Sequence, residues 1–256
     1  MGPKGVKIKT TPAETAIPIL QSKPNMKLQL RIFLLTVLAV SLLPLSTGRF
    51  LRGQTATAEA GSRKTSTPYT GDLSIFEYKD RDQKLQIQRV MDILGIHAGT
   101  AVADVGAGSG WFTVRAARRV GAAGMVYASD INPQAITYIK QRASREGFAN
   151  IQAIAGTEDD PRLPPRAIDC VLLLKTYHEI AHPLRLLENV RTALKPGARV
   201  GVIDRNGRGD DHGIARQIVI DEFKLAGFTL SQEYDFVKAD GMDYFLVFTP
   251  VREYRG

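Results

Sequence analysis

The sequence has little cysteine, because Cys170 is the single one among its 256 residues. One cysteine excludes an intrachain disulfide. Cys170 stands inside an apolar run, where a small buried side chain is the expected role. No internal repeat is apparent. Neither a disulfide framework nor a repeat array is therefore expected.

A broad excess of basic charge is also missing from most of the chain. The formal net charge is +8, but residues 1–60 hold eight Lys/Arg and two acidic residues, whereas residues 61–256 hold 26 and 24. The basic balance belongs mainly to the N-terminal extension, and the rest shows no basic stripe for nucleic acid. A hydrophobic content of 44% allows a packed core.

An apolar run long enough to span a membrane with ease is missing as well. The run over residues 32–45 is shorter than the roughly 20 residues that a spanning helix needs, and Pro44 interrupts it. Lys27 and Arg31 precede it, and a zone of small residues with A-x-A sites follows. This layout is typical of a secretory signal peptide, and an uncleaved anchor is the other interpretation.

The extension sets the expected domain boundaries and location. Residues 1–60 are predicted to be an extension with a signal peptide or membrane anchor, 61–74 a flexible linker, and 75–256 the folded domain. Met26 is a second possible start. We expect an exported, periplasmic or membrane-anchored protein that associates with the membrane through residues 32–45, with the cytoplasm as the alternative.

From residue 80 onward, strand and helix patterns alternate. Five alternations predict a doubly wound α/β fold with a mostly parallel, Rossmann-like sheet, closed by a C-terminal antiparallel hairpin. A ligand is expected at the carboxyl ends of the strands, near the switch in strand order. The expected strands are 101–105, 125–130, 150–156, 168–174, 199–204, 229–236 and 243–249, and the expected helices are 80–94, 111–120, 132–146, 183–194 and 214–226.

The segment VADVGAGSGWFT, residues 102–113, lacks one glycine of the dinucleotide fingerprint. In G-x-G-x-x-G counted from Gly106, the third glycine falls at position 111, where this chain has Trp111. The segment instead reads D-x-G-x-G-x-G from Asp104. It resembles the first motif of class I S-adenosylmethionine-dependent methyltransferases.

The resemblance extends over about residues 75–250. Asp130 ends the second strand, where this family has a carboxylate that binds both ribose hydroxyls, and LKPGARVGVID is similar to the family's LKPGG segment. DRD at 80–82 and GT-x-DDP-x-LP in the middle resemble small predicted methyltransferases. The resemblance implies S-adenosylmethionine as cofactor and a small-molecule methyl acceptor. The cofactor-binding residues that it implies are Asp104, Gly106, Ala107, Gly108, Gly110, Asp130, Ile131, Glu158, Asp159, Leu174 and Lys175.

Tyr177 and His178 both follow the fourth strand, at the edge of the sheet where a ligand is expected, and they are candidates for a catalytic role. The alternative interpretation is that Tyr177 and His178 are ordinary loop residues without a catalytic role. The acidic residues 158–160 have a similar alternative, a solvated loop of which only one member touches the adenine. A second class of function also stays open: a non-catalytic exported or membrane-anchored binding module that retains the fold.

Residues 178–182, HEIAH, match the H-E-x-x-H pattern of zinc metallohydrolases. Pro183 follows His182 directly, which disfavours one helix carrying both histidines and favours a helix that begins at residue 183. A catechol-type metal site would need a carboxylate just after the fourth strand, where Lys175 stands. No required metal is therefore expected, and His178 becomes a candidate to orient or deprotonate an acceptor.

Overall fold

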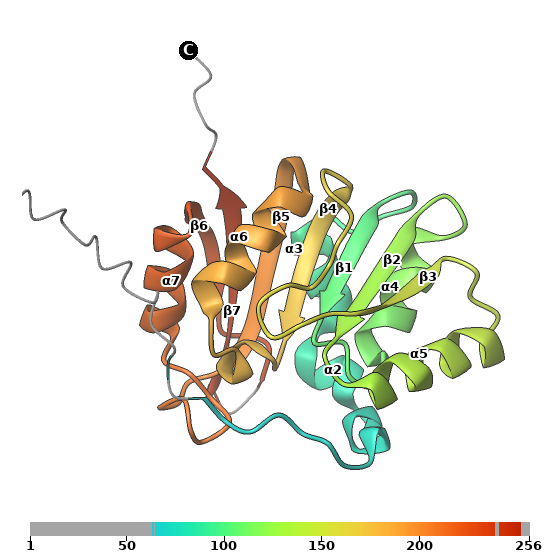
Figure 1. The fold of residues 1–256 in the computed structure, drawn as a ribbon, viewed down its shortest axis with the longest axis horizontal. Coiled ribbons are helices and arrows are strands. Elements are labelled where there is room, and N and C mark those ends of the chain that lie inside the picture. Colours follow the sequence, from blue (N-terminus) through green and yellow to red (C-terminus); the bar gives the residue numbers. More distant parts are fainter. Residues whose placement is uncertain (1–62, 64, 239–240, 252–256) are drawn as a thin grey trace, which may run out of the picture. The chain divides into compact units, whose positions relative to one another are not determined.

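The computed structural model describes residues 63, 65–238 and 241–251 (Figure 1). Seven strands form one sheet in the order β3-β2-β1-β4-β5-β7-β6. The order reverses between β1 and β4, which is where a doubly wound fold places its ligand. The strands are β1 (Ala101–Val105), β2 (Met125–Asp130), β3 (Ile151–Ala155), β4 (Ile168–Leu174), β5 (Leu194–Arg205), β6 (Phe228–Tyr234) and β7 (Asp243–Pro250).

The central strands are apolar because both of their faces are covered. In the parallel register, Val102 pairs with Val126 on one side and with Cys170 on the other. All three side chains are fully buried. Burial also raises the pKa of the Cys170 thiol well above its ordinary value. The predicted role of Cys170 as a small buried side chain is confirmed.

Successive strand residues point to opposite faces, and different helices cover the two faces. Val102 packs with α3 (Ile87–Leu94) and α4 (Trp111–Val120), while Ala103 packs with α6 (Pro183–Ala193) and α7 (Arg216–Leu225). Figure 1 shows α6 and α7 in front of the sheet and α3 behind it. Helix α5 (Pro133–Arg145) packs beside β2 and β3 and begins after Asn132, whose side chain accepts a hydrogen bond from the Gln134 N–H.

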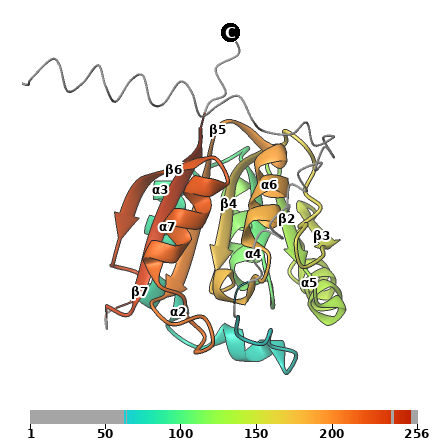
Figure 2. The same ribbon diagram turned by 60° about the vertical axis from the view of Figure 1, so that its left-hand side comes forward.

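The C-terminal strands confirm the predicted hairpin. Strand β7 runs antiparallel to both β5 and β6, whereas the other strand pairs are parallel. The predicted Rossmann-like fold with an antiparallel end is therefore confirmed (Figure 2).

The helix predicted over residues 80–94 is wrong as one element. The chain forms α2 (Arg81–Leu85) and then α3, separated by Gln86 in the left-handed conformation at φ 47°. A residue in the left-handed conformation interrupts the hydrogen-bond pattern of a right-handed helix, so α2 and α3 are two separate helices. Asp80 precedes α2 without donating or accepting a capping side-chain bond.

The strand predicted over residues 199–204 starts earlier than expected, because β5 already begins at Leu194. Leu194 pairs with Ile168, and the register then shifts before Arg199 pairs with Cys170. Gly197, at φ 82°, lies within this irregular stretch. A glycine accommodates such a bulge because it has no side chain to clash in that conformation.

The described residues belong to one compact unit, residues 56–256. Within them, no helix has the length and apolar character to cross a membrane. The predicted extension over residues 1–60, including the run 32–45, lies outside the described residues.

Candidate functional site

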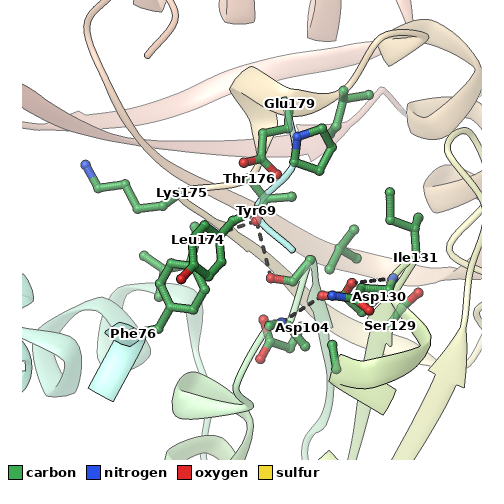
Figure 3. A pocket seen from close by; sticks show the side chains of 18 of the residues that line it. Tyr69, Phe76, Asp104, Ser129, Asp130, Ile131, Leu174, Lys175, Thr176 and Glu179 are labelled. Atoms are coloured by element: carbon green, nitrogen blue, oxygen red, sulfur yellow. Dashed lines mark hydrogen bonds between the residues drawn. The ribbon is translucent and has the colours of Figure 1, made fainter. Parts of the chain in front are cut away.

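A pocket of about 720 Å³ opens at the carboxyl ends of β1, β2 and β4 (Figure 3). Its volume lies within the range of small-molecule and cofactor sites. The predicted residues that line it are Asp104, Gly106, Ala107, Gly108, Asp130, Ile131, Glu158, Leu174, Lys175 and His178. Asp159, Gly110 and Tyr177 were predicted with them and do not line it.

The glycine loop after β1 forms the floor of the pocket. Gly106 has a φ of 74°, and a β-carbon there would lie 2.2 Å from the Cγ2 atom of Thr176. Only glycine fits this position, because any side chain would be strained and would collide with Thr176. Gly110 is also left-handed and stands just before α4, so its role is to make the turn rather than to face the pocket.

Asp104 is the last residue but one of β1 and is buried, with 2% of its surface exposed. The Thr113 hydroxyl donates a 2.6 Å hydrogen bond to its Oδ2 atom. Burial raises the pKa of Asp104 to about 7, and the nearby charge of Asp130 adds to this, while Thr113 and Arg81 act in the opposite direction. A buried carboxylate of this kind is stabilised in its charged form by a cationic ligand.

Asp130 ends β2 and faces the same pocket. Its Oδ2 accepts a 2.8 Å bond from the Gly108 N–H, and its Oδ1 accepts a 2.8 Å bond from the Asn132 N–H. Burial raises its pKa, and these backbone donors oppose that rise. The bond from Gly108 ties the end of β2 to the glycine loop, and the two bonds together fix the direction of the carboxylate (Figure 3).

Of the predicted adenine-side acids, Glu158 lines the pocket and Asp159 does not. The Asp159 carboxylate instead lies 3.3 Å from the Arg185 guanidinium, and Asp159 also accepts a bond from Asn189 through its carbonyl. Asp159 was predicted to bind the cofactor, and in the structure its contacts with Arg185 and Asn189 give it a structural role instead. Ile131 lines the pocket with 46% of its surface exposed, which leaves an apolar face for a ligand.

Leu174 and Lys175 follow β4 into the pocket wall. Lys175 has a left-handed φ of 58°, and its Nζ lies 2.5 Å from the buried carboxylate of Asp243. The ion pair directs the amino group toward β7, so Lys175 contributes its backbone and side-chain stem to the pocket.

His178 is held by a carboxylate from the neighbouring strand. Asp204 is fully buried, its Oδ1 lies 2.9 Å from the His178 Nδ1, and its Oδ2 accepts the His178 backbone N–H at 3.0 Å. This pairing leaves Nε2 as the ring nitrogen that faces the pocket. Glu179 follows with a pKa raised to about 7, first by burial and then by the charges of Asp204 and Asp130, while His178 opposes the rise.

Tyr177 was predicted as a catalytic candidate, and the structure corrects this. Its side chain is fully buried in the core on the α6 and α7 face, and its hydroxyl donates a 2.8 Å bond to Glu222. Burial raises its pKa well above the ordinary value. Tyr177 and His178 are successive residues of the 3₁₀ helix Tyr177–Glu179 and therefore point in different directions, and of the two His178 lines the pocket.

The segment before α2 was predicted to be mostly linker, but it covers the pocket. Residues 65–76 run across the carboxyl ends of the strands (Figure 1), and Tyr69 and Phe76 line the pocket with their rings 5.4 Å apart. This segment has no motif, and the aromatic residues before the domain were its one signal in the sequence. The apolar pocket residues that it adds to Ile180 and Leu186 are Pro68, Tyr69, Leu73 and Phe76.

Contacts at both ends hold this cover in place. At one end, Arg63 lies 3.3 Å from Glu222, and the Ser66 hydroxyl donates a 3.1 Å bond to the Gly209 carbonyl. At the other end, Glu77 accepts a 2.6 Å bond from Arg142 of α5. The cover is thereby anchored to both sides of the sheet.

His212 also lines the pocket, and the sequence did not indicate it as a site residue. It comes from the loop between β5 and α7 and lines the pocket beside His178, with the two rings 6.0 Å apart and nearly perpendicular. Nothing in the local sequence around His212 indicates this, because the loop is brought there by the order of the strands.

Comparison with known proteins agrees with this geometry. Residues 96–231, more than half of the chain, match the family described as methyltransferase domain. The chain belongs to this methyltransferase family. The predicted class of S-adenosylmethionine-dependent methyltransferase is confirmed, and with it the enzyme class and the cofactor.

Individual relatives are distant. The ubiquinone/menaquinone biosynthesis C-methyltransferase UbiE of Methylococcus capsulatus is 30% identical over 115 residues, which cover 44% of this chain and 46% of that protein. The protein of the same name from Marinomonas is 26% identical over 43% of this chain and 44% of that protein. The chain thus matches less than half the length of these two relatives.

Two solved structures show the same fold. A SAM-dependent methyltransferase from Aquifex aeolicus aligns with a TM-score of 0.64 at 22% identity, covering 71% of this chain and all of that chain (100%). The 1,6-didemethyltoxoflavin-N1-methyltransferase of Burkholderia thailandensis, with bound 1,6-didemethyltoxoflavin and S-adenosylhomocysteine, aligns with a TM-score of 0.52 at 17% identity, covering 70% and 81%.

Proposed function

We propose that this protein transfers a methyl group from S-adenosylmethionine to a small, ring-bearing molecule bound under the 65–76 cover. One observation carries the proposal. Two strand-end carboxylates, Asp104 and Asp130, line the same pocket as His178 and Glu179. The pocket thus has a polar part suited to the donor and a separate part suited to an acceptor.

The donor is proposed to lie along the ends of β1 and β2. Asp130 would accept hydrogen bonds from the ribose hydroxyls, and Glu158 would face the adenine. The buried Asp104, with the Gly106–Gly108 loop, would face the cationic end of the donor, because a buried carboxylate that lines the pocket is stabilised by a positive charge beside it. Ile131 and Leu174 supply apolar contacts on either side.

The acceptor is proposed to lie between the cover and η2 (Tyr177–Glu179). Tyr69, Phe76, Ile180 and Leu186 give that part an apolar and aromatic wall. Such a wall favours a flat apolar molecule with a few polar groups. The relatives that are C-methyltransferases of quinone biosynthesis, and the N-methyltransferase of toxoflavin, support a ring-bearing acceptor.

The transfer itself requires mainly alignment. A lone pair or carbanion of the acceptor forms a bond to the methyl carbon, the carbon–sulfur bond breaks, and its electron pair goes to sulfur. Holding the two reactants in line can contribute about 7–11 kcal/mol to the rate enhancement. An acceptor that carries a proton must also lose it, and we propose that His178, directed by Asp204, orients the acceptor or aids that loss.

We also propose that the protein is exported or anchored in a membrane, on the basis of the basic and apolar pattern that ends at residue 45. Cell fractionation of the full chain, with detection of a tag at its C-terminus, tests this. Recovery of an uncleaved chain entirely in the cytosol would contradict it.

Calorimetric titration of the full chain with S-adenosylhomocysteine is the test of the donor site. Binding in the micromolar range is expected, and it should be lost in Asp130→Ala. Transfer is then tested by incubating the protein with labelled donor and a panel of hydroxylated and amino-substituted ring compounds. A protein that binds neither S-adenosylmethionine nor S-adenosylhomocysteine would contradict the proposal.

A further inference from the structure

Three potential metal ligands converge at the acceptor end of the pocket. In the part of the chain that the structure describes, His178, Glu179 and His212 offer ligand atoms that all lie within 4.8 Å of one another. His178 and Glu179 belong to η2, whereas His212 lies on the loop between β5 and α7. All three line the pocket.

The first ligand, His178, is preorganised. Its side chain is 5% exposed, and the Asp204 carboxylate lies 2.9 Å from Nδ1, so in the neutral imidazole that donates this hydrogen bond the free lone pair is on Nε2. Within the described residues Nε2 makes no hydrogen bond, and the Glu179 Oε1 is 3.8 Å away. A carboxylate that fixes the tautomer and direction of a histidine is the usual support of a metal-binding histidine.

The second histidine is placed by a strained loop. His212 has a left-handed φ of 55°, and its backbone N–H donates a 2.9 Å bond to the Ser66 hydroxyl. A non-glycine residue in this region persists only where surrounding contacts hold it. The Ser66 hydroxyl in turn donates to Gly209, so the cover segment fixes the loop that brings His212 to His178.

We propose that His178 Nε2, Glu179 and His212 bind a divalent transition-metal ion, with Zn²⁺ as the best fit. Two imidazoles and one carboxylate form a typical catalytic zinc set, in which bonds of about 2.0–2.2 Å leave a further position open. The ligand atoms need small side-chain movements to reach such distances from the present spacing. The exposed His212 lies at the pocket mouth, which gives the ion a path of entry.

This site reuses only half of the HEIAH motif. His182 precedes Pro183 at the start of α6 and is not part of the group, so the spacing that suggested a zincin is not the basis of the site. No metal was expected because Pro183 disfavours one helix that carries both histidines and because Lys175 stands where a carboxylate would be needed. His212 gave no signal in the sequence because it is 34 residues away from His178.

The role of the ion rests on the proposed function. An open metal position beside the aromatic wall would bind an oxygen of the acceptor and help it to lose its proton to water. The oxygen, or a ring carbon conjugated with it, would then attack the methyl carbon. The acceptor is therefore expected to carry a hydroxyl group that can bind a metal.

The four histidines of the chain provide a matched test. Metal-stripped full-length protein is titrated with Zn²⁺ by calorimetry, and with Co²⁺ by visible absorption. One ion per chain is expected, with affinity weakened about tenfold or more in His178→Ala, His212→Ala and Glu179→Gln, and about 10–100-fold in Asp204→Asn. His97→Ala and His182→Ala should bind as the unmodified protein does.

Equal loss in His182→Ala, unchanged affinity in His212→Ala, or no binding by the stripped protein would overturn the site. Binding of S-adenosylhomocysteine by each variant shows that the fold is retained, and it also separates the two proposals. Metal binding without donor binding would contradict the proposed function and leave the metal site standing, and the reverse would overturn the metal site alone.

Discussion

The carboxylate of Asp204 holds His178 at two points, the ring Nδ1 and the backbone N–H. It also accepts the Arg205 N–H at 2.8 Å, and it is completely buried. Three donors on one buried carboxylate fix both the loop after β4 and the direction of the imidazole. Asp204 is therefore a positioning residue for His178, at the end of the pocket where we propose that the acceptor binds.

We expect His178→Ala and Asp204→Asn to slow methyl transfer while leaving the affinity for S-adenosylhomocysteine within about twofold. The loss should be roughly 100-fold or more for His178→Ala, the range of a positioned acid–base or orienting group. Steady-state rates on the identified acceptor, together with calorimetry, check this. An unchanged rate in His178→Ala would remove His178 from the mechanism.

Gly106→Val should abolish donor binding and lower stability. Its β-carbon would lie 2.2 Å from Thr176 Cγ2, and the backbone φ of 74° is unfavourable for valine. Gly147→Val is a matched control, because Gly147 has a φ of 72° but no atom within 4 Å of the place that a β-carbon would take. Thermal unfolding and calorimetry should show loss of binding only at position 106.

Asp130→Ala should weaken donor binding by about 100-fold or more. It removes the acceptor of two backbone bonds at 2.8 Å and, in our proposal, the partner of both ribose hydroxyls. Asp169→Ala, which removes a carboxylate remote from the pocket that pairs with Lys195, is the control. Equal effects of the two substitutions would argue against a ribose role for Asp130.

Asp104 should make the stability of the unliganded protein depend on pH. Its folded pKa of about 7 lies above the ordinary value of 3.8, so the folded state binds the proton more tightly. The contribution of Asp104 to stability is therefore greatest below about pH 4 and declines as pH rises toward 7. Asp104→Asn should stabilise the unliganded protein on the order of 1–3 kcal/mol more at pH 8 than at pH 5.

Denaturant unfolding at the two pH values measures this difference. The same carboxylate is proposed to contact the cationic donor. The affinity of the protein for S-adenosylmethionine should therefore rise roughly tenfold between pH 6 and pH 8, because the carboxylate becomes charged over this range. Asp104→Asn should bind more weakly with little change over this range. An unmodified protein whose affinity is independent of pH would contradict a contact between Asp104 and the cationic end of the donor.

Tyr177→Phe should leave transfer unchanged and lower stability. The hydroxyl donates to Glu222 at 2.8 Å inside the core and does not line the pocket. Loss of one such bond costs about 1 kcal/mol. A rate reduced by more than about threefold, with donor binding intact, would return Tyr177 to the site.

Local sequence patterns were sufficient to predict the sheet and the end of the pocket where we propose that the donor binds. Residues 101–105 and 168–174 could be predicted to the residue, since short apolar runs of this length are typical of strands that are covered on both faces. Asp104 and Asp130 stand at strand ends, and parallel strands bring their carboxyl ends together. The break at Gln86 was not predictable, because nothing in its side chain requires a left-handed backbone.

The acceptor end was decided by tertiary structure alone. The sequence determined a methyltransferase fold and one histidine after the fourth strand, and it offered HEIAH as a local pair. Packing turned Tyr177 into the core, left His182 at a helix start, and placed His212 and the 65–76 cover beside His178. These residues meet because the strand order and the Ser66 and Asp204 bonds bring distant loops together, and no spacing along the chain encodes that meeting.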